Sequence, residues 1–328
     1  MKAVLLSGFG GVDVLRIGEA PDPAPKDEEL LVRVRATALN RADLLQRRGK
    51  YPPPEGASGI LGLEMAGEVI STGPAVRGFG KGERICALLP GGGYAQLVTI
   101  PAGLAIRLDD RLSDEEGAAI PEAFLTAYRN LFVLGGLHAG QTVLLHAAAS
   151  GVGTAAIQLI REAGASALVT AGSREKIRRC LELGARAAWN RTEGPFAPWV
   201  AAQTGGKGVD LILDSVGAAY LEQNLASLAE DGKLIVIGLM GGSVAPNLDL
   251  APLLMRGLAV LGSRLRGLSV ESKRRLTEQF VAHVMPGFAE GKLRPVIDSV
   301  YDWRDVARAH ARMEANANIG KIVLRVTE

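Results

Sequence analysis

The sequence predicts an α/β protein with two domains, one of them a doubly wound parallel sheet and the other mostly β. Two patterns support this prediction. Short strand-like segments divided by Gly and Pro turns fill residues 1–120, whereas apolar strand patterns alternate with helical patterns farther along the chain. The chain also has 328 residues, which exceeds the size at which one hydrophobic core stops growing.

In the first domain, six apolar or alternating segments are typical of β-strands. They are AVLL from Ala3, VLRIG from Val14, LLVRVRATAL from Leu30, GLEMAGEVI from Gly62, ERICALL from Glu83 and AQLVTI from Ala95. Turn-forming stretches such as PPPEGASG and LPGGGY separate them. These segments predict a mostly β, partly barrel-like domain over residues 1–122.

A helical segment, SDEEGAAIPEAFLTAYRNL, follows this domain. Ser113 and Glu116 have the spacing of a capping box, which places a helix start at Ser113. Pro121 is expected to bend or interrupt the helix, because proline donates no backbone hydrogen bond. We expect this segment to link the two domains.

The second domain is predicted over residues 123–265 from its alternating strands and helices. The strands are VLLH from Val143, LVTAG from Leu168, AAWN from Ala187, VDLILDS from Val209, KLIVIGL from Lys233 and LAVLGSRL from Leu258, with helices at 152–163, 174–183 and 219–229. Nearly continuous apolar strands of this kind are typical of a parallel sheet covered on both faces, as in a Rossmann-type domain.

The tail, residues 266–328, returns to mixed structure. It contains a helical pattern near 270–290, the strand IDSVYDW, the helix DVARAHARMEA and the last strand GKIVLRV. We expect the tail to complete the first domain. Within the second domain, the apolar strand at 257–265 should lie at the sheet edge, where pairing with a second copy would form a homodimer.

Composition excludes several classes of function. The net charge is +2, and the Lys and Arg residues are scattered among acidic residues. The sequence therefore has no basic stripe of the kind that binds a nucleic-acid backbone. No apolar stretch has the length of a membrane span, and the first apolar run is too short for a signal peptide, so we expect a soluble, cytoplasmic protein. Cys86 and Cys180 lie far apart and the four histidines are never paired, so we expect no metal site.

The segment VLLHAAASGVGTAAIQL predicts a dinucleotide-binding turn, because a strand runs through small residues directly into a helix. The residues that open this helix are Ser150, Gly151, Val152 and Gly153. Free N–H groups and the helix dipole at such a terminus attract a pyrophosphate. A strict glycine fingerprint would place glycine at Ala148 and Ser150, so a tight turn without a ligand is the alternative for this pattern alone.

The end of the second strand indicates which nicotinamide cofactor binds. An acidic residue there would bind the 2′-hydroxyl of NADH, whereas this strand ends in Gly172 and Ser173. Lys176 follows in the next helix, and Arg191 follows the third strand. A hydroxyl with nearby cations favours the 2′-phosphate of NADPH, although each cation taken singly is equally typical of a solvated surface charge.

Eight segments in order carry a family resemblance: ALNRADLLQRRGKYPPP, ILGLEMAGEV, LPGGGYAQLVTIP, AAIPEAFLTAY, SGVGTAAIQL, VTAGSREK, GLMGG and MEANANIGKIVL. The chain resembles the zinc-free, zeta-crystallin-like quinone oxidoreductase branch of the medium-chain dehydrogenase/reductase superfamily, and within it most closely the tumour-suppressor-inducible group. Where zinc-bearing relatives have Gly-His-Glu, this chain has Gly62, Leu63 and Glu64. The resemblance implies a GroES-like catalytic domain and NADPH-dependent hydride or electron transfer to a quinone, without metal or flavin.

The resemblance also implies catalytic residues. It places Asn40 and Asp43 at the floor of a cleft beside the nicotinamide, and Tyr51 as hydrogen-bond donor to the carbonyl oxygen of the acceptor. Each residue has a structural alternative. Asn40 would cap the following helix, Asp43 would pair with Arg41, Arg47 or a neighbouring helix end, and Tyr51 would pack on the adjacent prolines.

Further cofactor contacts are implied in the same way. They are Thr126 on the linking helix, Gly238, Met240 and Gly241 after the fifth strand, and Asn316, Asn318 and Lys321 in the tail, with Lys321 as a phosphate contact. A plain β-turn is the alternative for the GLMGG stretch, and a helix C-cap is the alternative for Asn316.

Two rival functions follow from the same residues. An enoyl or alkenal reductase would use the same hydride geometry with a differently shaped acceptor site around Tyr51, Leu63, Phe124 and Leu265. A cofactor-binding structural or RNA-binding protein is a second rival, which the cofactor motif and the scattered surface charge disfavour.

Overall fold

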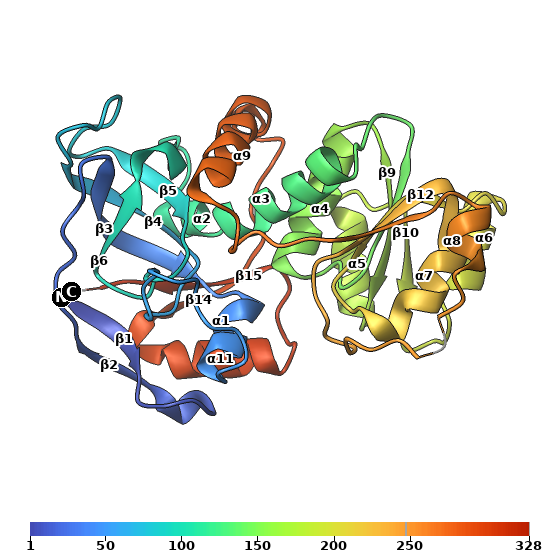
Figure 1. Cartoon of the computed structure of the whole chain (residues 1–328), viewed down its shortest axis with the longest axis horizontal. Coiled ribbons are helices and arrows are strands. Elements are labelled where there is room, and N and C mark those ends of the chain that lie inside the picture. Colours follow the sequence, from blue (N-terminus) through green and yellow to red (C-terminus); the bar gives the residue numbers. More distant parts are fainter. Residues whose placement is uncertain (247, 328) are drawn as a thin grey trace. The chain divides into compact units, whose positions relative to one another are not determined.

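The computed structural model describes residues 1–246 and 248–327, and the chain divides into two compact units (Figure 1). Unit 1 comprises Met1–Leu125 and the tail from Leu265, and unit 2 comprises Thr126–Arg264. The expected domain limits, 122 and 265, lie within three residues of these divisions. The first division falls inside helix α3 (Pro121–Tyr128), which runs through it without a break. Glu328, the expected end of the first domain, lies outside the described residues.

Unit 1 contains a seven-stranded sheet in the order β14-β15-β3-β4-β5-β7, with β6 also paired to β3. The strands are β3 (Glu29–Ala38), β4 (Glu64–Thr72), β5 (Arg84–Leu88), β6 (Leu97–Pro101), β7 (Ala105–Arg107), β14 (Ile297–Asp302) and β15 (Lys321–Arg325). A separate antiparallel pair is formed by β1 (Lys2–Leu6) and β2 (Leu15–Glu19). Since β15 pairs with β3, the tail completes this unit.

The alternation along β3 explains how this sheet buries one face. Val32 and Val34 are buried, whereas the intervening Arg33 and the following Arg35 are exposed. The buried face packs with Trp303 and other apolar side chains in one core cluster. The helices of unit 1 are α1 (Arg41–Arg47), α2 (Asp114–Ala118), α9 (Val270–His283), α10 (Met285–Ala289), α11 (Val306–Glu314) and the first part of α3.

Two expected helices are interrupted by proline. The capping box is present, because Ser113 Oγ accepts from the N–H of Glu116 and Glu116 accepts from the N–H of Ser113. Helix α2 nevertheless ends at Ala118, and Pro121 begins α3. The helix expected near 270–290 is two helices, because Pro286 lies in the first turn of α10, where its missing N–H costs nothing.

Unit 2 contains a six-stranded parallel sheet in the order β10-β9-β8-β11-β12-β13. The strands are β8 (Thr142–Leu145), β9 (Ser166–Ala171), β10 (Ala187–Asn190), β11 (Val209–Asp214), β12 (Leu228–Val236) and β13 (Ala259–Gly262). Numbered within the unit, this order is 3-2-1-4-5-6, the doubly wound order of a Rossmann-type domain. The Rossmann-type prediction is therefore confirmed, and β13 lies at the sheet edge.

The helices of unit 2 are α4 (Gly151–Glu162), α5 (Arg174–Glu182), α6 (Ala197–Thr204), α7 (Leu221–Ser227) and α8 (Ala251–Met255), with a π-helical turn at Arg129–Leu134 after α3. Helices α6 and α8 are absent from the sequence expectation, because each is short and begins with a proline at its first or second position. The central strands are fully buried at Leu144, Ile212 and Leu234. Among the described residues, no helix has both the length and the apolar character to cross a membrane.

Candidate active site and dinucleotide site

A buried ion pair joins the first residue of β4 to the first residue of β15. Glu64 is fully buried, and the Nζ of Lys321 lies 2.6 Å from its Oε1. The same ammonium donates to the carbonyl oxygen of Leu39 at 2.8 Å and to Oδ1 of Asn40 at 2.7 Å. All three N–H groups of Lys321 are therefore used inside unit 1. The expectation that Lys321 binds a cofactor phosphate stays a prediction, and the structure gives its ammonium a different set of partners.

Asn40 completes this network from the end of β3. Its Nδ2 donates to Oε1 of Glu64 at 2.8 Å and to the carbonyl oxygen of Ala38 at 3.2 Å, while its Oδ1 accepts from Lys321. The second carboxylate oxygen of Glu64 accepts from the N–H of Glu122 at 2.8 Å. Asn40 therefore contacts both members of the ion pair, and it also forms a capping box with Asp43 at the start of α1, as the alternative for Asn40 predicts.

Asp43 is also fully buried, one turn into α1. Its Oδ2 accepts from the N–H of Asn40 at 2.8 Å, and its Oδ1 accepts from the N–H of Gly62 at 3.0 Å. Burial raises the pKa of Asp43 to about 6, although these two backbone bonds oppose the rise. Arg41 instead binds the side chain of Asn316, so the alternative pairing of Asp43 with Arg41 is not formed among the described residues. Asp43 therefore binds the end of α1, and its pKa lies closer to neutral than that of an exposed aspartate.

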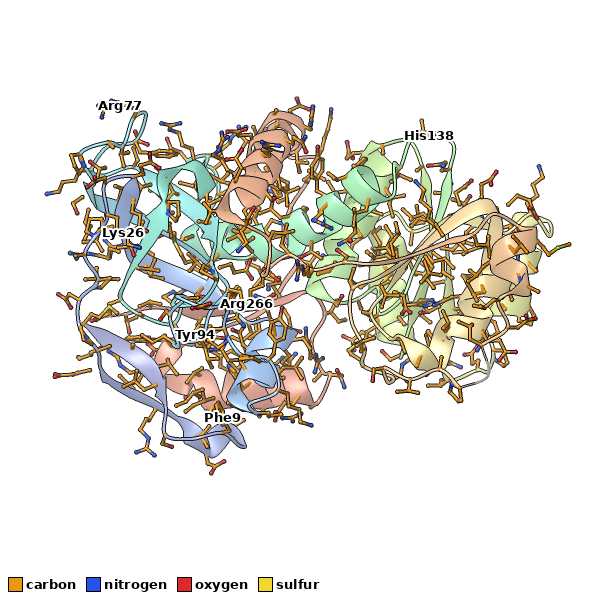
Figure 2. The ribbon with its side chains drawn as sticks, in the orientation of Figure 1. Phe9, Lys26, Arg77, Tyr94, His138 and Arg266 are labelled. Atoms are coloured by element: carbon orange, nitrogen blue, oxygen red, sulfur yellow. The ribbon has the colours of Figure 1, made fainter. Side chains whose placement is uncertain are left out.

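A buried polar chain extends from Asp43 through Tyr94 and His310 to Arg47; Figure 2 labels Tyr94. The hydroxyl of Tyr94 bonds to Asp43 and lies 3.3 Å from Nε2 of His310, whose Nδ1 lies 3.2 Å from Nη1 of Arg47. Arg47 in turn forms an ion pair with Glu314. Burial lowers the pKa of His310 to about 3, so this imidazole is neutral. Asp43 and Arg47 therefore do not form the alternative ion pair with each other. Tyr94 and His310 connect the two side chains instead.

Tyr51 lies in the loop after α1 and is 36% exposed. Its ring contacts the guanidinium of Arg266, with Cζ 5.3 Å from the ring centroid. Sequence reasoning missed Arg266, although it considered the loop near Leu265 for acceptor choice. The signal was weak, because one arginine after an apolar strand is typical of a solvated surface position.

Glu122, at the start of α3, was also missed. Its backbone N–H binds Glu64, but its own Oε2 is buried and has no hydrogen-bond partner within the described residues. Burial, followed by the nearby carboxylate of Glu64, raises the pKa of Glu122 to about 8. This side chain is therefore a protonated carboxylic acid at neutral pH.

In unit 2, the expected dinucleotide turn opens α4. Ser150 is the N-cap residue, and its side chain accepts from the N–H of Gly153 at 3.1 Å. A Cβ at residue 153 would lie 2.4 Å from the carbonyl oxygen of Ala148, so only glycine fits this turn. Gly151 and Val152 form the first helical positions, where backbone N–H groups point out of the helix. These residues fit a pyrophosphate at the helix N-terminus.

The cations expected to bind a 2′-phosphate lie at the carboxyl end of β9. Ser173 is the N-cap residue of α5 and accepts from the N–H of Lys176 at 3.3 Å. A Cβ at Gly172 would lie 2.9 Å from Nε of Arg191, so the guanidinium lies against the backbone of this strand tip. The geometry brings the hydroxyl of Ser173 and the guanidinium of Arg191 to the same strand tip, with Lys176 one turn into α5.

The other expected cofactor residues are spread over both units. After β12, the N–H groups of Met240 and Gly241 bind the carbonyl oxygens of Ser215 and Val216, and a Cβ at Gly238 would lie 2.9 Å from Ser215 O. The carbonyl oxygen of Thr126 accepts from the side chain of Asn130 at 2.7 Å.

In the tail, Asn316 has a φ of +51° directly after α11, as in a left-handed helix C-cap, and Asn318 donates to Gly320 O at 2.8 Å. The roles of these residues toward a cofactor stay predictions.

A buried polar network beneath the dinucleotide turn was not expected from the sequence. His146 follows β8, and its Nδ1 lies 2.9 Å from Oγ1 of Thr170 while its Nε2 lies 2.7 Å from Oδ1 of Asn224. Asn224 donates to Asp214 at 3.1 Å. Burial lowers the pKa of His146 to about 4, so the ring is neutral. The network links the carboxyl ends of β8, β9 and β11, and it holds the strand ends on which a dinucleotide would lie.

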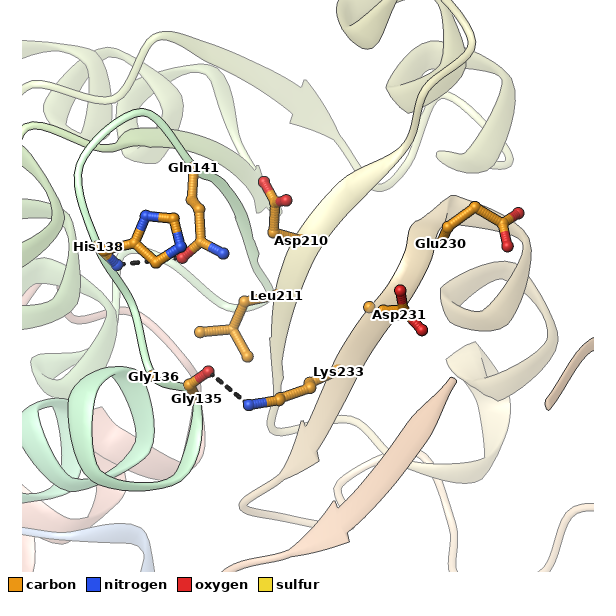
Figure 3. Close-up of a pocket in the computed structure, with 10 residues that line it drawn as sticks. Gly135, Gly136, His138, Gln141, Asp210, Leu211, Glu230, Asp231 and Lys233 are labelled. Atoms are coloured by element: carbon orange, nitrogen blue, oxygen red, sulfur yellow. Dashed lines mark hydrogen bonds between the residues drawn. The ribbon is translucent and has the colours of Figure 1, made fainter. Parts of the chain in front are cut away.

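A cavity of about 290 Å³ lies on unit 2, lined by residues that precede β8, begin β11 and lie within β12 (Figure 3). Its lining includes His138, Gln141, Asp210, Asp231 and Lys233, and Lys233 donates to Gly135 O at 3.0 Å. Ligands of doubly wound sheets bind at the carboxyl ends of the strands. This cavity lies at the opposite, amino end of β8 and β11, so it is separate from the dinucleotide turn.

The family models match both units. Residues 26–110 match the model described as "Alcohol dehydrogenase GroES-like domain", and residues 151–282 match the model described as "Zinc-binding dehydrogenase". The chain is 32% identical to the quinone oxidoreductase of Lama guanicoe, over 99% of this chain and 97% of that protein. The chain belongs to the quinone oxidoreductase-like group of the medium-chain dehydrogenase/reductase superfamily. Its unit 1 is accordingly GroES-like and its unit 2 is Rossmann-type.

Members of this superfamily with other names are similar too. The chain is 31% identical to part of a phenolphthiocerol/phthiocerol polyketide synthase protein of Mycobacterium tuberculosis, over 97% of this chain and 14% of that protein. Among solved structures, an NAD-dependent alcohol dehydrogenase matches with a TM-score of 0.88 and 33% identity, covering all of both chains. A mycobacterial protein complexed with NADPH matches with a TM-score of 0.90 and 29% identity, over 99% of this chain and all of that one.

The residues of this chain do not fit the zinc that the second family description names. Leu63 has no donor atom, and the carboxylate of Glu64 is bound by Lys321, Asn40 and the backbone of Glu122. Burial holds the pKa of the Cys86 thiol well above its usual range, which disfavours the thiolate that zinc requires. No group of three or more His, Cys, Asp or Glu within residues 1–246 and 248–327 is arranged to hold a metal.

Proposed function

We propose that this protein is an NADPH-dependent quinone oxidoreductase that transfers hydride or electrons without metal or flavin. The observation that carries the proposal is the set of partners around Glu64, in the segment where zinc-bearing relatives have Gly-His-Glu. Lys321 and Asn40 occupy its carboxylate, and Leu63 offers no ligand. Without a Lewis acid, a simple alkoxide lacks stabilisation, whereas a quinone carries its own electron sink. Full-length similarity to quinone oxidoreductases supports the same acceptor class.

NADPH, when bound, would supply the hydride. Ser150, Gly151, Val152 and Gly153 would hold its pyrophosphate, because they present N–H groups at the start of α4. Lys176 and Arg191, with the hydroxyl of Ser173, would bind the 2′-phosphate at the end of β9. The NADPH complex of a similar mycobacterial protein supports this choice, whereas the similar alcohol dehydrogenase is named as NAD-dependent.

The residues of unit 1 would receive the acceptor. The hydroxyl of Tyr51 would donate a hydrogen bond to the carbonyl oxygen on which negative charge grows during transfer. Asp43, with its pKa raised to about 6, would exchange the proton that the reduced acceptor needs. Asn40 and Lys321 would position Glu64 and hold the floor of this region rigid.

The test is oxidation of NADPH and NADH by the purified, metal-free protein with ortho-quinones, para-quinones, enals and simple aldehydes. Rapid turnover of quinones that is specific for NADPH is expected. Turnover of enals alone would indicate an enzyme that reduces conjugated C=C bonds. Cofactor binding without turnover would favour a structural or RNA-binding role. Equal turnover with NADH would contradict the cofactor assignment.

The role of Tyr51 has its own test. Tyr51→Phe is expected to lower quinone turnover about tenfold while leaving NADPH affinity nearly unchanged, because only the hydroxyl donor is lost. Tyr301→Phe is the matched control, since Tyr301 also contacts an arginine, Arg308, at 5.8 Å on β14. An unchanged rate for Tyr51→Phe would assign this ring to packing.

A second candidate function is reduction of an enoyl group. It is favoured by the structural match to the CurK enoyl reductase, with a TM-score of 0.89 and 27% identity over 99% of both chains. Hydride transfer to a conjugated C=C bond needs the same donor to a carbonyl oxygen. Comparison of kcat/KM for a quinone and an enoyl thioester distinguishes the two functions.

We also propose that the protein is a homodimer joined through the edge of the unit 2 sheet. Strand β13 is the last strand of that sheet, and its Val260 is partly exposed. Leu254 and Met255 on α8, the preceding helix, are 85% and 78% exposed. Exposed apolar side chains and an unpaired strand edge are the features that a second copy would cover.

A further inference from the structure

Arg266 is a buried cation with one guanidinium nitrogen that has no hydrogen-bond partner among the described residues. Only 4% of the residue is exposed. Its Nε donates to Pro90 O at 2.8 Å, and its Nη2 donates to Oε1 of Gln46 at 2.8 Å. Its Nη1 is buried and has no hydrogen-bond partner within the described residues. Two of the three nitrogens thus fix the orientation of the guanidinium, and the third is left for another acceptor atom.

The groups around Arg266 compensate its charge only in part. Lys273, from α9, donates to Arg266 O at 2.7 Å and adds a second cation. Glu122, from α3, is protonated at neutral pH, because burial raises its pKa to about 8. The carboxylate of Asp43, from α1, supplies one negative charge nearby, but its oxygens already accept from the N–H groups of Asn40 and Gly62. The region has excess positive charge, and an unpaired buried guanidinium donor is costly unless an anion or a carbonyl binds it.

Tyr51 connects this cation to the proposed acceptor. Its ring lies over the guanidinium at 5.3 Å, and it is the partly exposed side chain of the pair. Tyr51, whose hydroxyl would bind the acceptor carbonyl, therefore contacts Arg266, whose Nη1 lacks a partner among the described residues. A substituent of an aromatic acceptor bound at Tyr51 would therefore lie near the guanidinium of Arg266.

We propose that Arg266 binds a carboxylate substituent of the acceptor, so that the protein selects aromatic acceptors that carry a negative charge. This inference rests on the proposed function for the reaction itself, and it adds the charge class of the substrate. The guanidinium would form a charge-assisted hydrogen bond to the carboxylate through Nη1, while Pro90 and Gln46 keep it in place.

The test uses phenanthrene-9,10-quinone and its 2-carboxylate as a neutral and a charged acceptor. Wild-type protein is expected to show a kcat/KM at least about tenfold higher for the carboxylate, the usual effect of a hydrogen bond to a charged group. Arg266→Met should abolish this preference, and Arg266→Lys should keep part of it. Arg275→Met is the matched control, because Arg275 is an exposed arginine of α9 paired with Glu271.

A binding measurement keeps the inference testable apart from turnover. Calorimetry with 2-naphthoate and its neutral counterpart 2-naphthamide is expected to show preferential binding of 2-naphthoate by the wild-type protein. Preferential binding without turnover of either quinone would support the role of Arg266 and contradict the proposed reaction. Equal binding of the two naphthalenes, or a carboxylate preference that survives in a folded Arg266→Met variant, would overturn the inference and leave Arg266 as a clamp between Gln46 and Pro90.

Discussion

The Nζ of Lys321 lies 2.6 Å from Oε1 of Glu64, although 257 positions separate the two residues along the chain. Both side chains are buried, Glu64 completely and Lys321 almost completely. The pair exists because β15 returns to β3 and so reaches the strand that neighbours β4. A buried ion pair is costly to break from one side, because the remaining charge has no water to solvate it.

Lys321→Met is therefore expected to destabilise the protein by about 3 kcal/mol or more, since it leaves the carboxylate of Glu64 buried without its cation. Urea unfolding followed by circular dichroism would measure the change. Lys292→Met serves as the control, because the exposed Lys292–Glu290 pair should contribute less than about 1 kcal/mol. Equal, small losses for the two variants would contradict the structural role of Lys321.

The same variant tests the predicted phosphate contact. All three N–H groups of Lys321 bind acceptors within unit 1. Folded Lys321→Met is therefore expected to have the same ratio of NADPH affinity to NADH affinity as the wild-type protein. Fluorescence titration of the two cofactors gives this ratio. A selective loss of NADPH affinity would instead support Lys321 as a phosphate ligand.

Lys176→Glu is expected to weaken NADPH binding at least about tenfold and NADH binding little, because a carboxylate repels the 2′-phosphate and suits the 2′-hydroxyl. The dissociation constants of both cofactors are the measurement. Lys207→Glu is the matched control, since Lys207 is an exposed lysine elsewhere in unit 2. Equal losses for NADPH and NADH would contradict the NADPH assignment.

Glu122→Gln is expected to stabilise the protein at high pH. The pKa of Glu122 is raised from 4.5 to about 8, so the folded state holds this proton more tightly than the unfolded state. The stabilising effect is complete below pH 4.5 and is lost as the pH rises through 8. Glutamine does not titrate, so the variant should gain on the order of 5 kcal/mol relative to wild type between pH 4.5 and pH 9, given about 1.4 kcal/mol per pKa unit.

Unfolding free energies of both proteins at these two pH values would show the effect. A difference between the proteins that does not change with pH would mean that Glu122 is ionised in the folded state, and it would remove the neutral acid from the surroundings of Arg266.

Val260→Lys is expected to weaken the proposed dimer, because a charged side chain at a strand edge opposes pairing with a second copy. Sedimentation equilibrium of wild type and variant measures the dissociation constant, for which a rise of at least about tenfold is expected. Val300→Lys is the control, because Val300 is an exposed valine of β14 at an edge of the unit 1 sheet. A monomeric wild-type protein would contradict the proposal directly.

Much of the fold was predictable because its signals are local. One short segment contains the strand pattern of VLLH, the small residues after it and the apolar face of the next helix. These features determine a βαβ unit independently of the rest of the chain. The capping box at Ser113 and Glu116 formed as expected for the same reason. The breaks at Pro121 and Pro286 follow from proline's missing N–H, although only the first was anticipated.

The candidate site was predictable only in part, because its contacts join residues far apart in sequence. Asn40, Asp43 and Tyr51 stood out through their resemblance to a family. Arg266 and Glu122 did not, since nothing around them in sequence shows that their polar side-chain atoms are buried.

The sequence alone determined the two-domain α/β class, the dinucleotide turn at the start of α4 and the cations after β9, because backbone geometry and hydrophobic periodicity are local properties. The tertiary structure decided that Lys321 neutralises Glu64, that His146 is held by Thr170 and Asn224, and that Tyr51 covers Arg266. Burial and charge pairing set the pKa of a side chain and decide which of its polar atoms lack a partner. Burial and charge pairing in turn depend on which distant strands the sheet brings together.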